Sequence, residues 1–267
     1  MISVPEKLAE LAGDDQAKAF NARYQLLEAA YQSTRPGNQA EQSALADALA
    51  AELTAKVPVE TKADEKKKKD APEERFKHST KVRREAIEIL GVVAGPKQVP
   101  AIVSALDELE LRETARCALD RVGGKEACAA LIAALDRVGS EFRVGVAGSL
   151  AKRRGDDVLR ALKGLATDTD LEVRLAAVEA LAELGDPDCE SAMVQAYRAP
   201  TTPTAAHDRP LSPRGELRIT KARIRLAERL RLAGHKTAAR YIYHSILGEG
   251  APLPQIKAAQ IGIEQMA

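Results

Sequence analysis

Arginines recur through the middle of this 267-residue chain at a nearly constant spacing. Each follows an apolar residue and precedes a leucine by seven positions, and successive ones stand 29, 31 and 31 residues apart: Arg83, Arg112, Arg143 and Arg174. A guanidinium is a planar fork of donors that suits carboxylates and phosphates. The four could therefore present a ladder to an acidic partner or to phosphates. Alternatively, they tie neighbouring turns together through acids such as Asp156, Asp157, Asp186 or Asp188. We favour this structural role, because packing between repeats requires one such residue per unit.

A second basic set follows one face of a predicted helix near the C-terminus. Its members are spaced 4, 3, 4 and 4 residues apart: Arg214, Arg218, Lys221, Arg225 and Arg229. With four further bases (Arg223, Arg231, Lys236 and Arg240), the stretch 214–240 holds nine bases against two acids, Glu216 and Glu228. This density fits a nucleic-acid footprint or an acidic protein partner. Against nucleic acid, aromatic residues that would stack on bases are absent from this stretch before Tyr241. The alternative is a solvated helix face whose aliphatic stems cover apolar neighbours.

Residues for catalysis or metal binding are sparse. None of the four histidines is followed by Glu or has a second His four positions away: His78, His207, His235 and His244. The three cysteines lack paired spacing and are typical of small core side chains in a reducing cytosol: Cys117, Cys128 and Cys189. No phosphate-binding glycine loop or nucleophile motif occurs. We therefore predict a non-enzymatic protein with no metal and no cofactor.

The spacing of the arginines also predicts the elements that position them. A period of about 30 residues is typical of stacked helical hairpins, because one such unit is too small to bury its own apolar face. The composition agrees: hydrophobic residues make up 45%, but aromatics only 3%, with no Trp. The net charge of +1 gives no global attraction to nucleic acid or anionic membrane. No apolar run approaches the roughly 20 residues of a membrane span, and no secretory signal begins the chain, so we expect a cytoplasmic protein without a membrane partner.

The predicted organisation has five segments. Residues 1–56 form an N-terminal helical cap with a polar outer face, in which Ala17, Phe20, Tyr24, Leu27 and Tyr31 stand at helical spacing. Residues 57–79 are a charged linker whose lysine run is nearly cancelled by acids, and 80–198 hold four repeats. In each repeat we expect a glycine to end the first helix in a left-handed conformation: Gly95, Gly123, Gly155 and Gly185. A Pro-rich loop follows at 199–213, and residues 214–267 form a helical hairpin plus half a repeat.

Residues 81–198 resemble HEAT repeats of the bacterial phycobilisome-lyase HEAT-like subtype. The motif is clearest from Val173-Arg174 to Leu181 with Leu184-Gly185-Asp186 after it, and it recurs at 81–95, 111–124 and 141–157. Residues 226–247 resemble a tetratricopeptide (TPR) hairpin, with these residues at that family's spacing: Ala227, Gly234, Ala239, Tyr243 and Leu247. The resemblance implies an armadillo-like, right-handed α-α superhelix that serves as an adaptor. The iron-binding hydroxylase branch of HEAT proteins needs His-Glu pairs, which this sequence lacks.

The sequence thus predicts an all-α solenoid of helical hairpins that acts as a scaffold. We expect it to bind another protein along the surface formed by the second helices of successive hairpins. One alternative is a nucleic-acid-associated solenoid that uses the basic face of residues 214–229. Another is an accessory of a lyase-type modifying enzyme, which would co-purify with a coloured ligand. The oligomeric state stays open, although an unpaired final helix with Ile256, Ala259 and Ile263 exposed would favour self-association.

Overall fold

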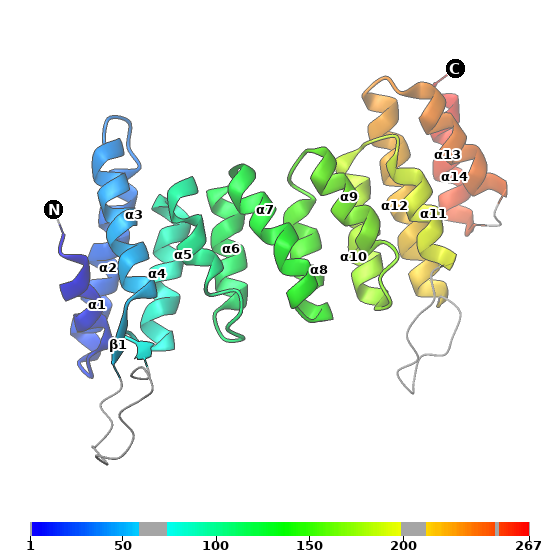
Figure 1. Cartoon of the computed structure of the whole chain (residues 1–267). Coiled ribbons are helices and arrows are strands. Elements are labelled where there is room, and N and C mark those ends of the chain that lie inside the picture. The colour runs from blue at the N-terminus through cyan, green and yellow to red at the C-terminus, as the bar shows by residue number, and fades with distance from the viewer. Residues whose placement is uncertain (1, 59–73, 199–211, 249–250, 267) are drawn as a thin grey trace, which may run out of the picture. The chain divides into compact units, whose positions relative to one another are not determined.

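The computed structural model describes residues 2–58, 74–198, 212–248 and 251–266, and nearly all of these lie in helices (Figure 1). The chain divides into two compact units, residues 1–134 and 135–267. This boundary falls inside the predicted segment 80–198, between its second and third repeats. The predicted all-α fold of helical hairpins is confirmed within each unit.

Unit 1 begins with three helices and continues with two hairpins. Its elements are α1 (Val4–Ala12), α2 (Gln16–Ser33), α3 (Gln39–Thr54), β1 (Lys56–Pro58), β2 (Glu74–Phe76), α4 (Thr80–Val93), the 3₁₀ turn η1 (Pro96–Gln98), α5 (Val99–Val103), α6 (Arg112–Val122) and α7 (Gly124–Ala134). Helix α4 packs against α6, and α2 and α3 cover its other side. The predicted helical cap of residues 1–56 thus contains three helices, which pack against the first repeat.

Unit 2 holds two further hairpins, a long hairpin and a final helix. Its elements are the 3₁₀ turn η2 (Leu135–Arg137), α8 (Ser140–Leu150), α9 (Asp156–Leu165), α10 (Leu171–Leu184), α11 (Cys189–Arg198), α12 (Pro213–Leu232), α13 (Lys236–Gly248) and α14 (Leu253–Glu264). First helices pack on first helices, α10 against both α8 and α12. The predicted Pro-rich loop lies outside the described residues from 199 to 211.

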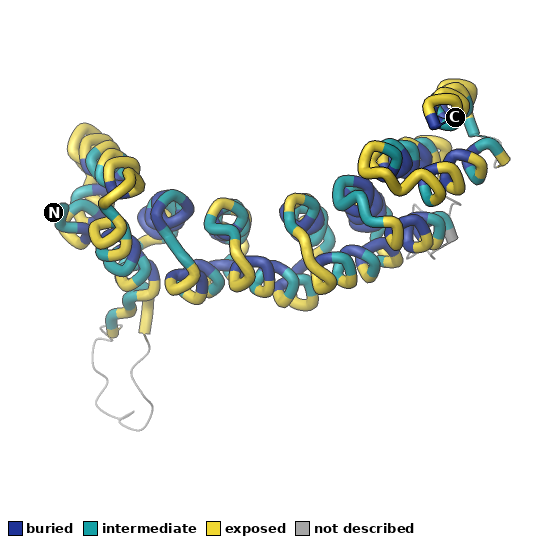
Figure 2. Tube along the Cα trace, turned by 90° about the horizontal axis from the view of Figure 1, so that it is seen from above, coloured by how far each residue is buried: buried dark blue, intermediate teal, exposed yellow. Residues whose placement is uncertain are grey.

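Buried residues lie where neighbouring helices of a unit meet (Figure 2). In α10 the apolar residues that follow the hydrophobic-Arg pair are buried, including Val178 and Leu181. Asp170 caps the start of the helix, because its carboxylate accepts hydrogen bonds from the backbone N–H groups of Glu172 and Val173 at 2.9 and 3.2 Å. The helix ends at Gly185, whose φ of +70° is the left-handed conformation expected there.

The expected left-handed glycine at the end of the first helix is missing in two repeats. In the third repeat, α8 ends at Leu150 with Ala151 as its C-cap, and Gly155 instead precedes α9. The first repeat departs from the expectation in another way. Gly95 has a φ of −114°, an extended conformation. Its backbone N–H instead donates to the side-chain oxygen of Gln98 at 2.9 Å, and η1 follows at once. A side-chain acceptor three residues on therefore replaces the left-handed cap at this turn.

Both ends of the predicted linker 57–79 are structured. Strands β1 and β2 pair antiparallel, with Lys56 opposite Phe76, and the Lys77 backbone N–H donates to the Ala55 carbonyl at 2.8 Å. The His78 ring nitrogen lies 2.6 Å from the Glu52 carboxylate, and its side chain is mostly buried. Phe76 anchors this segment, because the Arg83 guanidinium lies 3.5 Å from the centre of its ring. The lysine run itself lies outside the described residues.

The outer face of the N-terminal cap carries aromatic residues in addition to the polar residues that we expected. The face of α2 that packs inside unit 1 is made of Ala22, Leu26 and Ala30, each fully buried. Its aromatic residues point the other way and are largely exposed: Phe20, Tyr24 and Tyr31. The helix period had correctly placed these aromatics on one face, but that face is the outer one.

The final helix is only partly the exposed half-unit that the sequence suggested. Helix α14 packs on both α13 and α12. Ala259 is fully buried, and Ile256 and Ile263 are half-buried. Gly262 lies so close to the Tyr243 ring that a Cβ there would collide with it. The predicted exposed face of α14 is therefore largely covered by the preceding hairpin.

Candidate functional site

The repeated arginines lie at the starts of first helices, where they contact the turns that lead into first helices. In unit 1, Arg83 forms a bidentate pair with Glu108, with both N–O distances at 2.6 Å, and is 2% exposed. In unit 2, Arg143 reaches Asp168 at 3.1 Å. Both partners stand 25 residues after the arginine, in the turn before the next first helix. These two arginines therefore tie one repeat to the next.

The other two arginines bind backbone in the same turns. Arg112 donates to the Leu106 carbonyl at 2.7 Å, and Arg174 donates to the Asp168 carbonyl at 2.7 Å. Burial lowers the pKa of the Arg174 guanidinium, although Asp168 and Asp170 oppose that shift. Each of these turns thus receives two guanidinium groups, one from the preceding repeat and one from its own.

The acids that we expected to pair with these arginines are not their partners in the observed contacts. Those acids lie beside the glycine turns at the far end of the first helices: Asp156, Asp157, Asp186 and Asp188. The arginines lie near the starts of these helices, about 15 Å away along a ten-residue helix. Glu108 and Asp168, in the opposite turns, are the partners instead.

The basic face predicted on α12 splits into paired and exposed residues. Arg218 reaches Glu179 at 2.9 Å and Glu172 at 2.8 Å on α10, and the hydrogen bond that it donates to Glu179 raises the pKa of Arg218. Arg225 and Arg229 both pair with Glu183 of α10. Arg214 and Lys221 are exposed. Acids of the neighbouring helix therefore compensate three of the five predicted partner-binding residues.

One base counted in the same stretch is part of the core of unit 2. Arg223 is fully buried and lies 2.6 Å from Glu190 of α11. Its guanidinium also donates to the Ser245 hydroxyl of α13 at 2.9 Å. This arginine joins three helices, so it adds nothing to a surface charge. The basic residues around it in the sequence gave no sign of this burial.

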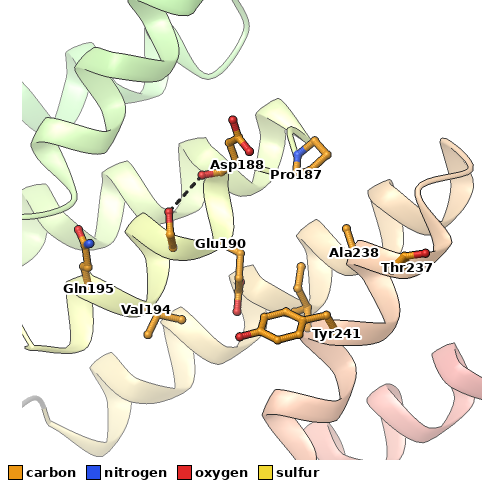
Figure 3. A pocket seen from close by; sticks show the side chains of 10 residues that line it. Pro187, Asp188, Glu190, Val194, Gln195, Thr237, Ala238 and Tyr241 are labelled. Atoms are coloured by element: carbon orange, nitrogen blue, oxygen red, sulfur yellow. Dashed lines mark hydrogen bonds between the residues drawn. The ribbon is translucent and has the colours of Figure 1, made fainter.

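A groove lies between α11 and α13, the second helices of two successive hairpins of unit 2 (Figure 3). Its volume is about 800 Å³, within the range of ligand-binding clefts. It is lined from both helices by Pro187, Asp188, Glu190, Ser191, Val194, Gln195, Thr237, Ala238, Tyr241 and Ile242. Tyr241 extends from α13 toward α11, as Figure 3 shows, and is 69% exposed. Sequence analysis expected binding along second helices but did not single out this tyrosine.

The groove combines apolar walls with short polar groups. Val194, Ala238 and Ile242 supply apolar surface, and Ser191, Gln195 and Thr237 supply hydroxyl and amide groups. The buried pair of Glu190 and Arg223 lies beside it, so the wall is held in a fixed geometry. Such a surface can contact apolar side chains and hydrogen-bond a peptide backbone at once.

Reactive chemistry near the groove is weak. Cys189 begins α11 and is buried, and burial raises the pKa of its thiol to about 11, so the thiol stays protonated at neutral pH. Within the described ranges, no three His, Cys, Asp or Glu side chains come together in a way that could hold a metal ion. Across the same ranges, no helix is both long and apolar enough to cross a membrane.

Comparison with known proteins places part of this architecture in a family. Residues 139–207 match the sequence model for HEAT repeats. This segment is a HEAT-repeat region. The match covers the two repeats of unit 2 that contain Arg143 and Arg174. No curated protein matches the chain in sequence. The resemblance of residues 226–247 to a TPR hairpin stays a prediction.

Several solved structures are similar to this chain. A structure of the complex of CpcE and CpcF of phycocyanin lyase from Nostoc sp. PCC7120 is 18% identical, covers 100% of this chain and 96% of that one, and has a TM-score of 0.43. Human deoxyhypusine hydroxylase is 14% identical, covers 98% of this chain and 94% of its own chain, and has a TM-score of 0.35. A designed armadillo repeat protein in complex with the peptide (KR)4 is 18% identical over the full length of both chains, with a TM-score of 0.32. Likenesses this distant carry no argument about function.

Proposed function

We propose that this protein is a non-enzymatic scaffold that binds a segment of another protein in the α11–α13 groove. The observation that carries the proposal is the groove itself, which joins two consecutive second helices and presents an exposed Tyr241 among apolar and hydrogen-bonding groups. Tyrosine is enriched among residues that dominate binding energy at protein interfaces. The HEAT-repeat architecture agrees with such a role, because repeats of this kind offer extended surfaces for partners.

The nucleic-acid alternative has less support. The basic face of α12 would need its guanidinium groups free for phosphates, but Arg218, Arg225 and Arg229 are paired with acids of α10. Binding of nucleic-acid phosphates to this face would break those ion pairs. Arg214 and Lys221 remain exposed, and two bases release few counterions on binding.

Affinity capture from a native lysate tests both functions. The baits are the wild-type chain, a groove variant with Tyr241→Ala and Val194→Glu, and the control Lys221→Glu, which changes an exposed residue of α12 outside the groove. Each bait is used with and without nuclease. We expect a stoichiometric protein partner that survives nuclease, is retained by the control and is lost from the groove variant.

Two results would contradict the proposal. Recovery that disappears with nuclease, or with Lys221→Glu, would favour the basic face and nucleic acid. Retention of the partner by the groove variant would place the binding surface elsewhere. Circular dichroism of the three baits shows whether the groove variant is still folded.

A further inference from the structure

The outer face of α2 is an exposed aromatic stripe that none of the described elements of unit 1 covers. The stripe consists of Phe20, Tyr24 and Tyr31, which are 73%, 59% and 61% exposed, together with the half-buried Leu27. These are three of the eight aromatic residues in a chain of three Phe, five Tyr and no Trp. A soluble protein rarely exposes such a contiguous set unless the surface binds something.

The spacing of the stripe indicates what shape fits it. With Ala17, its members are separated by 3, 4, 3 and 4 residues, an average of 3.5. This is the spacing by which one α-helix packs along another, with alternate residues meeting in layers. A second helix that runs along α2 would meet each of these positions in turn.

We propose that the helix on this face is α2 of a second copy of the chain, packed antiparallel. A two-fold axis between residues 25 and 26 puts Phe20 opposite Tyr31 of the second copy and Tyr24 opposite Leu27 of the second copy. All four positions of the stripe then find partners in the same stripe. A face that matches itself in this way is what a closed two-fold dimer requires.

Charges at the two ends of α2 also favour the antiparallel arrangement. Asp14 and Asp15 precede the first residue of the helix, and Arg35 follows its last. Antiparallel packing brings the acidic start of each α2 beside Arg35 of the other copy, and the two helix dipoles also oppose each other favourably. A parallel pair would instead bring acids beside acids.

The size of the stripe sets the strength of the dimer. Aromatic side chains bury about 150–250 Å² each, so the exposed parts of these three amount to about 400 Å² per copy. A standard stable interface buries about 800 Å² per partner. The dimer is therefore weak and depends on concentration, and it is not needed for the chain to fold.

Sedimentation equilibrium of the full chain from micromolar to submillimolar concentration tests the proposal. We expect the average mass to rise from 28.7 kDa toward twice that value. Tyr24→Glu with Tyr31→Glu should stay at the monomer mass throughout. The matched control Ile261→Glu changes an exposed residue of α14 and should dimerise as the wild type does. Circular dichroism confirms that each variant is folded.

A charge exchange tests the antiparallel geometry separately. Arg35→Asp alone and Asp14→Arg alone should each weaken association several-fold, and the two together should restore it. A wild-type chain that stays monomeric at every concentration overturns the proposal and leaves a helix of another protein as the occupant. Dimers that survive the tyrosine changes, or that are lost with Ile261→Glu, also overturn it. Failure of the charge exchange to restore association rules out the antiparallel pair.

Discussion

The repeated arginines act as ties within the units rather than as a surface array. Arg83 and Arg143 reach forward 25 residues to a carboxylate, and Arg112 and Arg174 reach back six residues to a carbonyl. A guanidinium serves both purposes because its donors lie in one plane and satisfy several acceptors together. The spacing of the motif thus records the geometry of the turns that join repeats.

Among these ties, the pair of Arg83 and Glu108 should contribute most to the stability of the fold. Both of its hydrogen bonds are short, and Arg83 is buried. Arg83→Ala removes them together with the contacts to Phe76 and the Leu53 carbonyl. We expect a loss of about 2–3 kcal/mol in the free energy of unfolding, measured by urea denaturation.

A double-mutant cycle isolates the ion pair from the other contacts of Arg83. Arg83→Ala combined with Glu108→Ala should show a coupling energy of about 1–2 kcal/mol. The neighbouring Arg84 donates only to an exposed carbonyl of Glu110, so Arg84→Ala should cost less than about 0.5 kcal/mol. Equal losses for Arg83→Ala and Arg84→Ala would show that the tie does not stabilise the repeats.

At the scale of elements, periodicity identified the helices but not always their buried faces. Helix α2 has two stripes, a small one of Ala22, Leu26 and Ala30 and a larger one of aromatic residues. Hydrophobicity alone assigns the larger stripe to the core. The small stripe is buried because its alanines let α2 approach the neighbouring helices closely. The sequence of α2 alone does not reveal which of its two stripes is buried.

The basic face of α12 shows a similar limit. Its spacing was read correctly as one face of a helix, but the acids that neutralise it stand on α10, about 40 residues earlier: Glu172, Glu179 and Glu183. Pairing between helices so far apart in sequence depends on how they pack. The same holds for Arg223, which the sequence places among surface bases and the fold buries against Glu190.

Two helical glycines offer a matched test of the packing of α14. Gly262 faces the buried Tyr243 ring, so the methyl group of Gly262→Ala would push α14 away from α13. We expect a loss of about 1–3 kcal/mol in the free energy of unfolding. Gly148 in α8 has open space around its Cβ position, so Gly148→Ala should instead stabilise by about 0.5–1 kcal/mol. Thermal denaturation of both variants measures the difference, and two shifts of the same sign would contradict this packing.

At the scale of the whole chain, the sequence was sufficient for the fold class and for the order of the helices. The apolar pattern and the turn glycines located each hairpin, because both are local in sequence. It was not sufficient for the groove, because residues 199–235 separate its two walls, α11 and α13, in the sequence. In the sequence Tyr241 is only the first aromatic residue after the basic stretch, whereas the structure shows it exposed and directed toward α11.

Hydrogen exchange of the captured complex, compared with the free protein, tests the central claim most directly. If a partner segment occupies the groove, backbone amides of α11 and α13 should exchange more slowly in the complex, while those of α8 and α9 are unchanged. Slower exchange confined to α12, or to α2 alone, would contradict the claim and move the binding surface to the basic face or to the aromatic stripe.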